Sequence, residues 1–386
     1  MPIQTETPIS SFTVARMDIY VFRAAVSVPV VTSFARMDSR ATAILRVEDS
    51  DGAYGWGEIW GNFPSITTEY RAQLAGWLLP SLVIGKTIDD PAAFFEEINT
   101  ALKVVEVQSD ERGPVGGVIA GLDQALWDLA ARRAAVPLRQ LLRADAPDRV
   151  PAYASGLNPG NGVDQAAAAR ENGFRRYKLK IGFGKDIDHT NIRRIKDAMG
   201  AGEMLYTDAN MRWSLEEAIE EAEKLAEFDL GWLEEPIRAD LPAETWRALK
   251  AKLPMPLAGG ENLRGDAAFT GALEWLDFVQ PDVGKLGGVS GCLGIGREAL
   301  VAGRTYCPHW LSGGVGLLHS ANLLAAAGGE GVLEMDINEN PLRDAVVASQ
   351  LSLVDGDACL PTGPGIGIDV DTAGMAAWQV SHESFS

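Results

Sequence analysis

Tyr177-Lys178-Leu179-Lys180-Ile181 is the stretch on which the fold prediction rests. In a β-strand successive side chains point to opposite faces, so Lys178 and Lys180 share one face and the other three side chains share the opposite face. Two ammonium groups on one face repel each other and are costly to bury, so this face must meet water, carboxylates, or a bound anion near a metal. Taken alone, the stretch fits an exposed strand with solvated lysines. The chain that follows it favours a functional strand.

From Val150 onward the sequence alternates short strands with helices. Val150–Ser155 is a predicted strand, and a helix over Val163–Asn172 ends at Gly173, ahead of the lysine strand. Six further strands are predicted, with helical patterns between them, over Met204–Thr207, Leu230–Leu233, Met255–Gly259, Phe278–Val283, Thr305–Pro308 and Val332–Met335. Eight short strands separated by helices over about 200 residues favour a parallel barrel, in which the strand C-termini carry the chemistry. The alternative is an open doubly wound sheet, but no Gly-rich phosphate loop opens any of these helices.

The first part of the chain, to about Asp148, mixes strands and helices. Strands are predicted over Val14–Arg23, Ala41–Glu48 and Ala53–Trp56, with a hairpin turn at Asp49–Gly52. Helical periodicity follows over Thr68–Leu79, Pro91–Val104 and Gly116–Ala134. This part therefore has an α+β pattern that differs from the alternation after Val150.

Composition limits the function classes. The chain has 386 residues, of which 46% are hydrophobic, so it can bury the core of two domains or of one barrel with additions. With 53 acidic against 34 basic residues its net charge of −19 disfavours nucleic acids and anionic membranes as partners. Three widely spaced cysteines disfavour a disulfide framework and are typical of a reducing compartment. Neither a signal peptide nor a membrane span is evident, so we expect a cytoplasmic protein.

Polar residues stand at the end of each predicted strand after the first, where a buried strand would normally exclude them. They are Lys178 and Lys180, Asp208 and Asn210, Glu234 and Glu235, Glu261 and Asn262, Asp282 and Lys285, His309, and Glu334. In a barrel these groups converge on one mouth, where the acids Asp208, Glu234 and Glu261 would repel one another unless a cation joins them. Three hard oxygen ligands suit Mg²⁺, one ion per subunit, with Mn²⁺ as the alternative. Glu235 must point to the other side of its strand, and each acid alone could be a solvated loop residue.

The lysines and His309 supply candidate acid–base groups. A substrate carboxylate could bridge the metal and Lys178, which would stabilise an enediolate when the adjacent C–H is deprotonated. Lys180 would be the base, because Lys178 and the metal both lower its pKa. His309 could act from the opposite side, held in its tautomer by Asp282, unless it is a core histidine with satisfied hydrogen bonds. Glu334 could bond the substrate carboxylate as a neutral acid.

These pieces, taken in order, resemble the enolase superfamily, and within it the mandelate racemase subgroup of acid-sugar dehydratases and racemases. The matching segments are Ala125-Leu-Trp-Asp-Leu129, Lys178-Leu-Lys180, Asp208-Ala-Asn210, Trp232-Leu-Glu-Glu-Pro236, Gly260-Glu-Asn262, Gln280-Pro-Asp282, Lys285-Leu-Gly-Gly288, Cys307-Pro-His309 and Leu333-Glu334. The resemblance implies a (β/α)7β modified TIM barrel at 149–360, an N-terminal α+β capping domain at 1–148, and a C-terminal segment at 361–386 that returns to the capping domain.

The resemblance also implies roles for particular residues. Asp208, Glu234 and Glu261 become the Mg²⁺ ligands, Lys180 and the His309–Asp282 pair become the bases on opposite faces of the substrate, and Lys178 and Glu334 contact its carboxylate. Capping-domain loops at Val30–Arg36 and Trp60–Phe63 would choose the substrate. Besides Lys178 and Glu334, the predicted substrate-binding residues are Arg36, Trp60, Asn62 and Asn210.

Three functions are compatible with this set. The first is Mg²⁺-dependent dehydration of a sugar acid or related hydroxy acid to a 2-keto acid, and the second is racemisation or epimerisation by the same two bases. The third is a barrel that binds a carboxylate without turnover. Lys285 could be mistaken for the sixth-strand lysine base of cycloisomerases and dipeptide epimerases, but the His309–Asp282 pair favours the mandelate racemase type. We expect a small-molecule carboxylate as the substrate and a homo-oligomer as the assembly.

Overall fold

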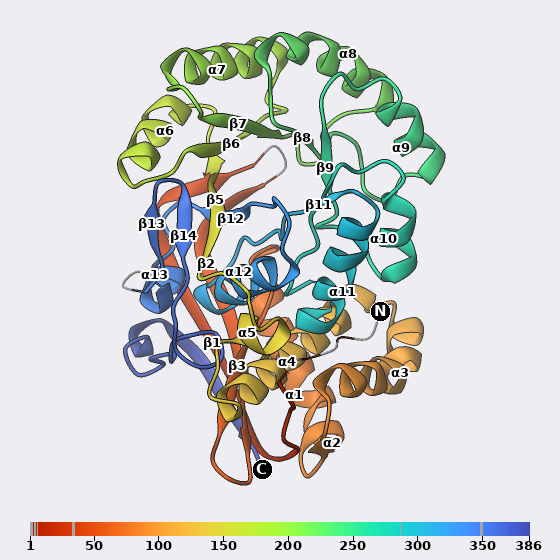
Figure 1. Ribbon diagram of the computed structural model, residues 1–386, viewed down its shortest axis with the longest axis vertical. Coiled ribbons are helices and arrows are strands. Elements are labelled where there is room, and N and C mark those ends of the chain that lie inside the picture. The colour runs from red at the N-terminus through yellow and green to blue at the C-terminus, as the bar shows by residue number, and fades with distance from the viewer. Residues whose placement is uncertain (1–2, 4, 6, 33–34, 286, 348–349) are drawn as a thin grey trace.

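The computed structural model describes residues 3, 5, 7–32, 35–285, 287–347 and 350–386, and they are organised by two sheets (Figure 1). The first sheet has the strand order β15-β1-β2-β3, with β4 also paired to β1. Its strands are β1 Phe12–Val31, β2 Arg36–Asp49, β3 Tyr54–Ile59, β4 Thr87–Ile88 and β15 Gln379–Phe385. The helices of this region are α1 Thr67–Leu78, α2 Pro80–Val83, α3 Pro91–Ser109, α4 Arg112–Arg133 and α5 Leu138–Leu142. Since β15 pairs antiparallel with β1, the end of the chain returns to this sheet.

The second sheet is a barrel of parallel strands whose connecting helices lie outside it. Neighbouring strands pair in chain order from β5 to β11, and β12 pairs with β5. The strands are β5 Arg149–Leu157, β6 Arg176–Lys180, β7 Met204–Asp208, β8 Leu233–Glu234, β9 Leu257–Gly259, β10 Phe278–Val279, β11 Thr305–Tyr306 and β12 Leu333–Asp336. The helices between them are α6 Gly162–Glu171, α7 Lys185–Ala198, α8 Leu215–Leu225, α9 Ala243–Lys250, α10 Asp266–Ala272, α11 Gly288–Val301 and α12 Gly314–Ala327. In Figure 1 the helices α6 to α9 form an arc around the outside of β6 to β9.

This arrangement confirms the predicted fold class. Seven helices alternate with eight parallel strands within the described residues, as in a (β/α)7β barrel, and an α+β region precedes them. Short elements complete the chain: α13 Pro341–Val347, the hairpin β13 Ser352–Val354 and β14 Asp357–Cys359, and 3-10 turns at Ala226–Phe228 and Ala376–Trp378. Among the described residues, no helix combines the length and apolar character that crossing a membrane requires.

Several predicted element bounds were wrong. The strand predicted at Val14–Arg23 extends to Val31, and β2 begins at Arg36, because the two strands continue to pair as far as Val31 and Arg36. Much of the predicted loop at 30–36 is therefore a hairpin end, while residues 33 and 34 lie outside the described part. Conversely, the paired part of several barrel strands is shorter than predicted, as at Phe278–Val279. Apolar runs mark burial rather than strand pairing, and Val283 is buried beyond the paired residues.

The long helix α4 joins the two parts of the molecule, since it packs against β3 on one side and α11 on the other. Nearly all its residues from Gly117 to Ala131 are buried. The close approach of β3 depends on glycine, because a Cβ on Gly57 would lie 2.0 Å from the carbonyl oxygen of Gly121. This contact packs the first sheet closely on α4, and α4 in turn packs against the barrel helix α11.

Candidate active site

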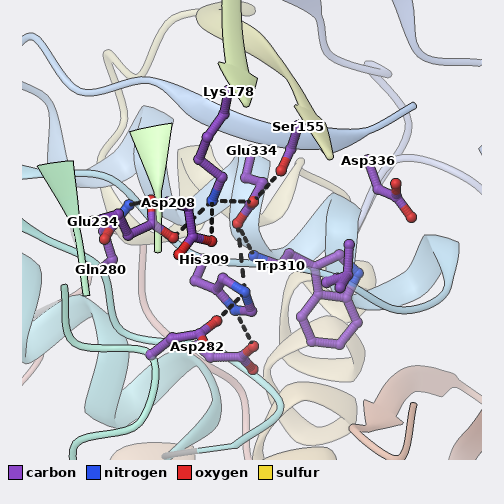
Figure 2. Close-up of polar contacts among 12 residues, drawn as sticks. Ser155, Lys178, Asp208, Glu234, Gln280, Asp282, His309, Trp310, Glu334 and Asp336 are labelled. Atoms are coloured by element: carbon purple, nitrogen blue, oxygen red, sulfur yellow. Dashed lines mark hydrogen bonds and ion pairs between the residues drawn. The ribbon is translucent and has the colours of Figure 1, made fainter. Parts of the chain in front are cut away.

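The lysine strand β6 is buried on both faces. Tyr177 and Leu179 are fully buried on one face, and on the other Lys178 is 0% exposed and Lys180 8% exposed. The alternative of an exposed strand with solvated lysines is therefore wrong. Both ammonium groups instead meet carboxylates at the end of the barrel. Figure 2 shows this for Lys178.

Lys178 is surrounded by acids from neighbouring strands. Its Nζ donates to Glu234 Oε1 at 2.7 Å and lies 2.7 Å from Glu334 Oε1 and 3.8 Å from Asp208 Oδ2. Burial alone would lower the pKa of Lys178, but the attraction of Glu234 and Glu334 outweighs it and raises the pKa well above its usual value. Lys178 is thus a fixed positive charge at the base of the site.

Lys180 donates from Nζ to Asp208 Oδ2 at 2.5 Å. The sequence predicted a lowered pKa for Lys180, and the structure differs in this respect. Burial and the charge of Lys178 lower the pKa, but the contact with Asp208 is stronger and the net shift is upward. The prediction also counted the charge of a metal held by Asp208, which would oppose this contact, so a lowered pKa in the metal-bound site stays a prediction.

His309 is held between acids on both of its ring nitrogens. Nδ1 lies 2.6 Å from Asp282 Oδ2, and Nε2 contacts Glu261. Asp282 is itself fixed, because its Oδ1 accepts the backbone N–H groups of Gly284 and Lys285 at 2.8 and 2.9 Å. Burial lowers the pKa of His309, but Glu261 and Glu334 outweigh it and raise the pKa to about 10. The predicted pairing of His309 with Asp282 is present in the structure.

Glu334 lies between Lys178 and His309, as Figure 2 shows. Ser155 Oγ donates to its Oε1 at 2.5 Å, and the backbone N–H of Trp310 donates to its Oε2 at 3.0 Å. Burial raises the pKa of Glu334, but Lys178 and His309 outweigh this effect and lower the pKa to about 2. These neighbours favour the ionised form of Glu334, and the predicted neutral acid beside a substrate carboxylate stays a prediction. The sequence prediction did not include Ser155. Its one signal in the sequence is that a small polar residue stands near the end of the first barrel strand.

The three predicted metal ligands lie at the ends of adjacent strands. Asp208 pairs in register with Glu234, and Glu261 follows β9, the next strand. Each carboxylate is bonded to a different cationic side chain, namely Lys180, Lys178 and His309 in that order. Among the residues the structure describes, no three acidic, histidine or cysteine side chains are arranged as metal ligands. The donor chemistry nevertheless fits Mg²⁺, because the buried Asp208 and Glu234 and the 13% exposed Glu261 supply hard oxygen ligands at one place.

Second partners hold these carboxylates in place. Asn210 donates its backbone N–H to Asp208 Oδ1 at 2.8 Å, and Gln280 Nε2 donates to Glu234 Oε2 at 2.9 Å. Glu235 points away from Glu234, as strand geometry predicted. It accepts from Asn262 Nδ2 at 2.8 Å, and burial and then Glu261 raise its pKa to about 8.

A cavity of about 240 Å³ lies above these groups, between the two parts of the molecule. The first sheet and its loops contribute Thr32, Ala35, Met37, Trp60, Asn62 and Phe63, and the barrel contributes Lys180, Asn210, Met211, Glu261, Asn262, Lys285, His309 and Leu311. Trp60, Asn62 and Asn210 thus lie where the sequence predicted substrate-binding residues. Lys285 Nζ lies 4.5 Å from the centre of the Trp60 ring and 3.7 Å from Glu261 Oε2.

Arg36, one of the predicted substrate-binding residues, does not line this cavity. Its side chain is 62% exposed and donates from Nε to Asp38 Oδ1 at 2.9 Å. Because Arg36 and Met37 are neighbours on β2, their side chains point to opposite faces, and Met37 is the one that lines the cavity.

Comparisons with known proteins match both parts of the chain. A family model described as "Enolase C-terminal domain-like" matches residues 162–374, and one described as "Mandelate racemase / muconate lactonizing enzyme, N-terminal domain" matches residues 16–143. Among curated relatives, a D-galactarolactone cycloisomerase of Agrobacterium fabrum is 29% identical over 91% of this chain and 95% of its own length. An arabinonate dehydratase of Saccharolobus solfataricus is 28% identical over 84% of this chain and 87% of its own.

Solved structures give the same result. A structure titled mandelate racemase/muconate lactonizing enzyme from Bordetella bronchiseptica RB50 is 43% identical with a TM-score of 0.88, and the match covers 95% of this chain and 99% of that one. The L-talarate/galactarate dehydratase of Salmonella typhimurium LT2, liganded with Mg and L-lyxarohydroxamate, is 26% identical with a TM-score of 0.85 and coverages of 99% and 95%.

Proposed function

The chain belongs to the mandelate racemase/muconate lactonizing enzyme family of the enolase superfamily, and on this premise we propose that it removes the proton α to a carboxylate. The overall reaction we propose is dehydration of a sugar acid or related hydroxy acid to a 2-keto acid, through an enediolate. The observation that carries the proposal is the pair of candidate bases, Lys180 and His309, that line one cavity above a cluster of buried carboxylates. Similarity to sugar-acid dehydratases supports the substrate class.

The cofactor of this family is Mg²⁺, and the residues present here fit it. We assign Asp208, Glu234 and Glu261 as the side chains that would hold the ion, since they are the three carboxylates at the ends of adjacent strands. When bound, Mg²⁺ supplies positive charge that stabilises the developing charge on the substrate carboxylate.

The chain's own groups would perform the proton transfers. Lys178, a buried cation, would face the substrate carboxylate together with Glu334 and its donors. Lys180, in its neutral form, would take the α-proton at Nζ. His309, as an imidazolium held by Asp282, would give the proton on Nε2 to the departing β-hydroxyl. Water leaves, and the resulting enol becomes the 2-keto acid. Trp60, Asn62 and Asn210 would contact the rest of the substrate.

A panel of aldonic and aldaric acids tests this proposal. Each acid is incubated with the full chain and Mg²⁺, and 2-keto acid is measured, with Lys180→Ala and His309→Asn as inactive controls. We expect at least one acid to yield a keto product with the unsubstituted chain only. Absence of product from every acid would argue against dehydration.

A second candidate is racemisation or epimerisation, and similarity to the structure titled mandelate racemase/muconate lactonizing enzyme favours it. If Lys180 and His309 serve opposite faces of the α-carbon and no group departs, the product is the inverted acid. Incubation in deuterium oxide distinguishes the two candidates. Deuterium at the α-carbon with inverted configuration and no keto acid would select racemisation or epimerisation.

We further propose a cytoplasmic homo-oligomer with a small-molecule carboxylate as its substrate. We keep the domain limits at 1–148, 149–360 and 361–386, which the pairing of β15 with β1 supports for the last segment. Light scattering on the full chain tests the oligomer.

A further inference from the structure

The carboxylate of Glu58 connects the first sheet to the barrel. Glu58 lies on β3, is 0% exposed, and accepts three hydrogen bonds. Thr42 Oγ1 donates to Oε1 at 2.6 Å, the Gly313 N–H donates to Oε1 at 2.6 Å, and the Gly316 N–H donates to Oε2 at 3.0 Å. Because every one of these neighbours is a donor, the ionised carboxylate is satisfied at this place.

Two of these donors belong to the start of α12, the barrel helix that follows His309. The first N–H groups of a helix have no partner within the helix and carry partial positive charge, which a carboxylate at this end satisfies. The fit around Gly313 is tight, because a Cβ there would lie 2.6 Å from Glu58 Oε1. Glu58 therefore caps α12 from another part of the molecule, 255 positions away in the chain.

The segment that Glu58 holds runs directly from His309 to α12. Within it Trp310 Nε1 donates to the carbonyl oxygen of Gly313 at 2.7 Å, while the backbone N–H of Trp310 donates to Glu334. Trp310 is thus fastened at Gly313 and at Glu334, and His309 is its neighbour in the chain. Moving Gly313 would move Trp310 and the backbone that carries His309.

A second link runs from Glu58 to the partner of His309. Gln124 on α4 donates from Nε2 to the carbonyl oxygens of Glu58 and Val283, at 2.9 and 3.1 Å. Val283 directly follows Asp282, whose Oδ2 meets His309 Nδ1. The segment after His309 is thus bonded to the Glu58 carboxylate. The segment after Asp282 is linked through Gln124 to the Glu58 backbone carbonyl. Lys180, by contrast, is on β6, which is paired between β5 and β7 inside the barrel.

We propose that Glu58 is a positioning residue for His309, through which the first sheet sets the orientation of one of the two candidate bases. Its importance for turnover rests on the proposed function, but its effect on His309 does not. Loss of the Glu58 contact should impair the step that needs His309 and spare proton removal by Lys180.

Two variants and one control test this role. Glu58→Gln keeps the shape but turns a donor group toward backbone N–H groups, and Gly313→Ala adds one methyl group that displaces the carboxylate. The control is Asp18→Asn, because Asp18 is an equally buried acid of the same sheet whose bonds go to Arg16 and His382 instead.

The first readout is the ¹⁵N side-chain spectrum of the histidines in the full chain with Mg²⁺ at one pH. We expect the His309 signals to shift in Glu58→Gln and Gly313→Ala and to stay in place in Asp18→Asn, where the His382 signals move instead. His189, in α7, serves as the reference. The His309 signals are assigned as those that disappear in His309→Asn. Unchanged His309 signals in the folded variants would overturn the proposal, and if Glu58→Gln does not fold, Gly313→Ala decides.

The second readout uses a substrate identified by the acid panel. In both variants we expect keto acid formation to fall by about 10- to 100-fold, while exchange of the α-proton with deuterium oxide is retained. An equal loss of both rates would overturn the selective effect on His309. If no acid is turned over, the proposed function fails, and the spectrum still decides the positioning.

Discussion

His309 lies near three carboxylates, those of Asp282, Glu261 and Glu334, and Asp282 is the one on Nδ1. Asp282 is held by two backbone N–H groups and has its remaining oxygen on His309 Nδ1. This arrangement keeps the ring in one tautomer and stabilises its charged form. Glu261, on Nε2, is a proposed metal ligand. Asp282 is therefore the residue that orients the ring during the reaction.

We predict that Asp282→Asn lowers turnover by about 10³-fold, because the amide can no longer stabilise the imidazolium. Steady-state kinetics with a substrate from the acid panel measures the change. The matched control is Asp277→Asn. Asp277 directly precedes β10, is paired with Lys250 and accepts from the Leu257 N–H, so its substitution should leave turnover unchanged. Full activity of Asp282→Asn would show that His309 does not need this carboxylate.

The contacts that set the charge states could not be predicted from the sequence at two residues of the site. Glu334 was predicted to be neutral and Lys180 to have a lowered pKa, whereas the pKa of Glu334 is lowered and that of Lys180 is raised. Strand alternation shows which face a side chain occupies but not the distance to its neighbours. A contact of 2.5 Å between Lys180 and Asp208 reverses the sign of the shift.

An ion pair outside the candidate active site joins the elements around the lysine strand β6. Arg170 at the end of α6 donates from Nε and Nη2 to the two oxygens of Glu203, each at 2.6 Å, and Tyr177 of β6 donates to the same carboxylate at 3.0 Å. The hydrogen bonds from Arg170 lower the pKa of Glu203 to about 2, from an ordinary value of 4.5. Glu203 thus fastens β6 to α6.

We predict that this contact stabilises the fold only when Glu203 is ionised. Because the folded pKa lies below the unfolded one, the stabilisation is present above pH 4.5 and is lost as the pH falls toward 2. Glu203→Gln should lower the free energy of unfolding by about 1 kcal/mol at pH 7, allowing for the partial exposure of Arg170. Urea unfolding from pH 7 to pH 3 should show this difference narrowing. Glu227→Gln, in an exposed pair with Arg193, is the control and should have little effect.

The contact between β3 and α4 gives a prediction about packing. Gly57→Ala would place a methyl group 2.0 Å from the Gly121 carbonyl oxygen, so the backbones must separate. We expect the free energy of unfolding to fall by about 3 kcal/mol, measured by urea denaturation. Gly113→Ala is the control, since it lies in α4 with open space around it. An equal effect of both substitutions would contradict the role assigned to close packing.

The sequence predicted the order of these elements better than their extent. Helix and strand periodicities identified the alternation, and the polar residue at each strand end marked the mouth of the barrel. The bounds failed where pairing continues beyond an apolar run, as at Val31 and Arg36. The contact of Glu58 with Gly313 could not be predicted, because local spacing has no information on residues 255 positions apart.

At the scale of the whole molecule, two parts of the chain enclose one cavity. Metal binding beside this cavity should therefore raise the free energy of unfolding of the folded chain. A ligand that binds only the folded chain adds about 2.7 kcal/mol at 100 times its dissociation constant. We predict that Mg²⁺ raises the Tm and that EDTA reverses the increase, as measured by calorimetry. Asp208→Asn should remove most of the increase. A Tm that does not respond to Mg²⁺ would argue against the assigned ligands.

The pairing of β1 with β15 has a consequence for synthesis on the ribosome. Residues 17–22 of β1 pair with residues 379–385, so this edge of the first sheet stays unpaired until those later residues have been synthesised. Until then one edge of β1 is open to pairing with other strands, including those of nascent neighbours. The barrel, whose strands pair in chain order, can assemble before that edge is covered. Newly made chains are therefore exposed to misassembly at β1 throughout synthesis of the barrel.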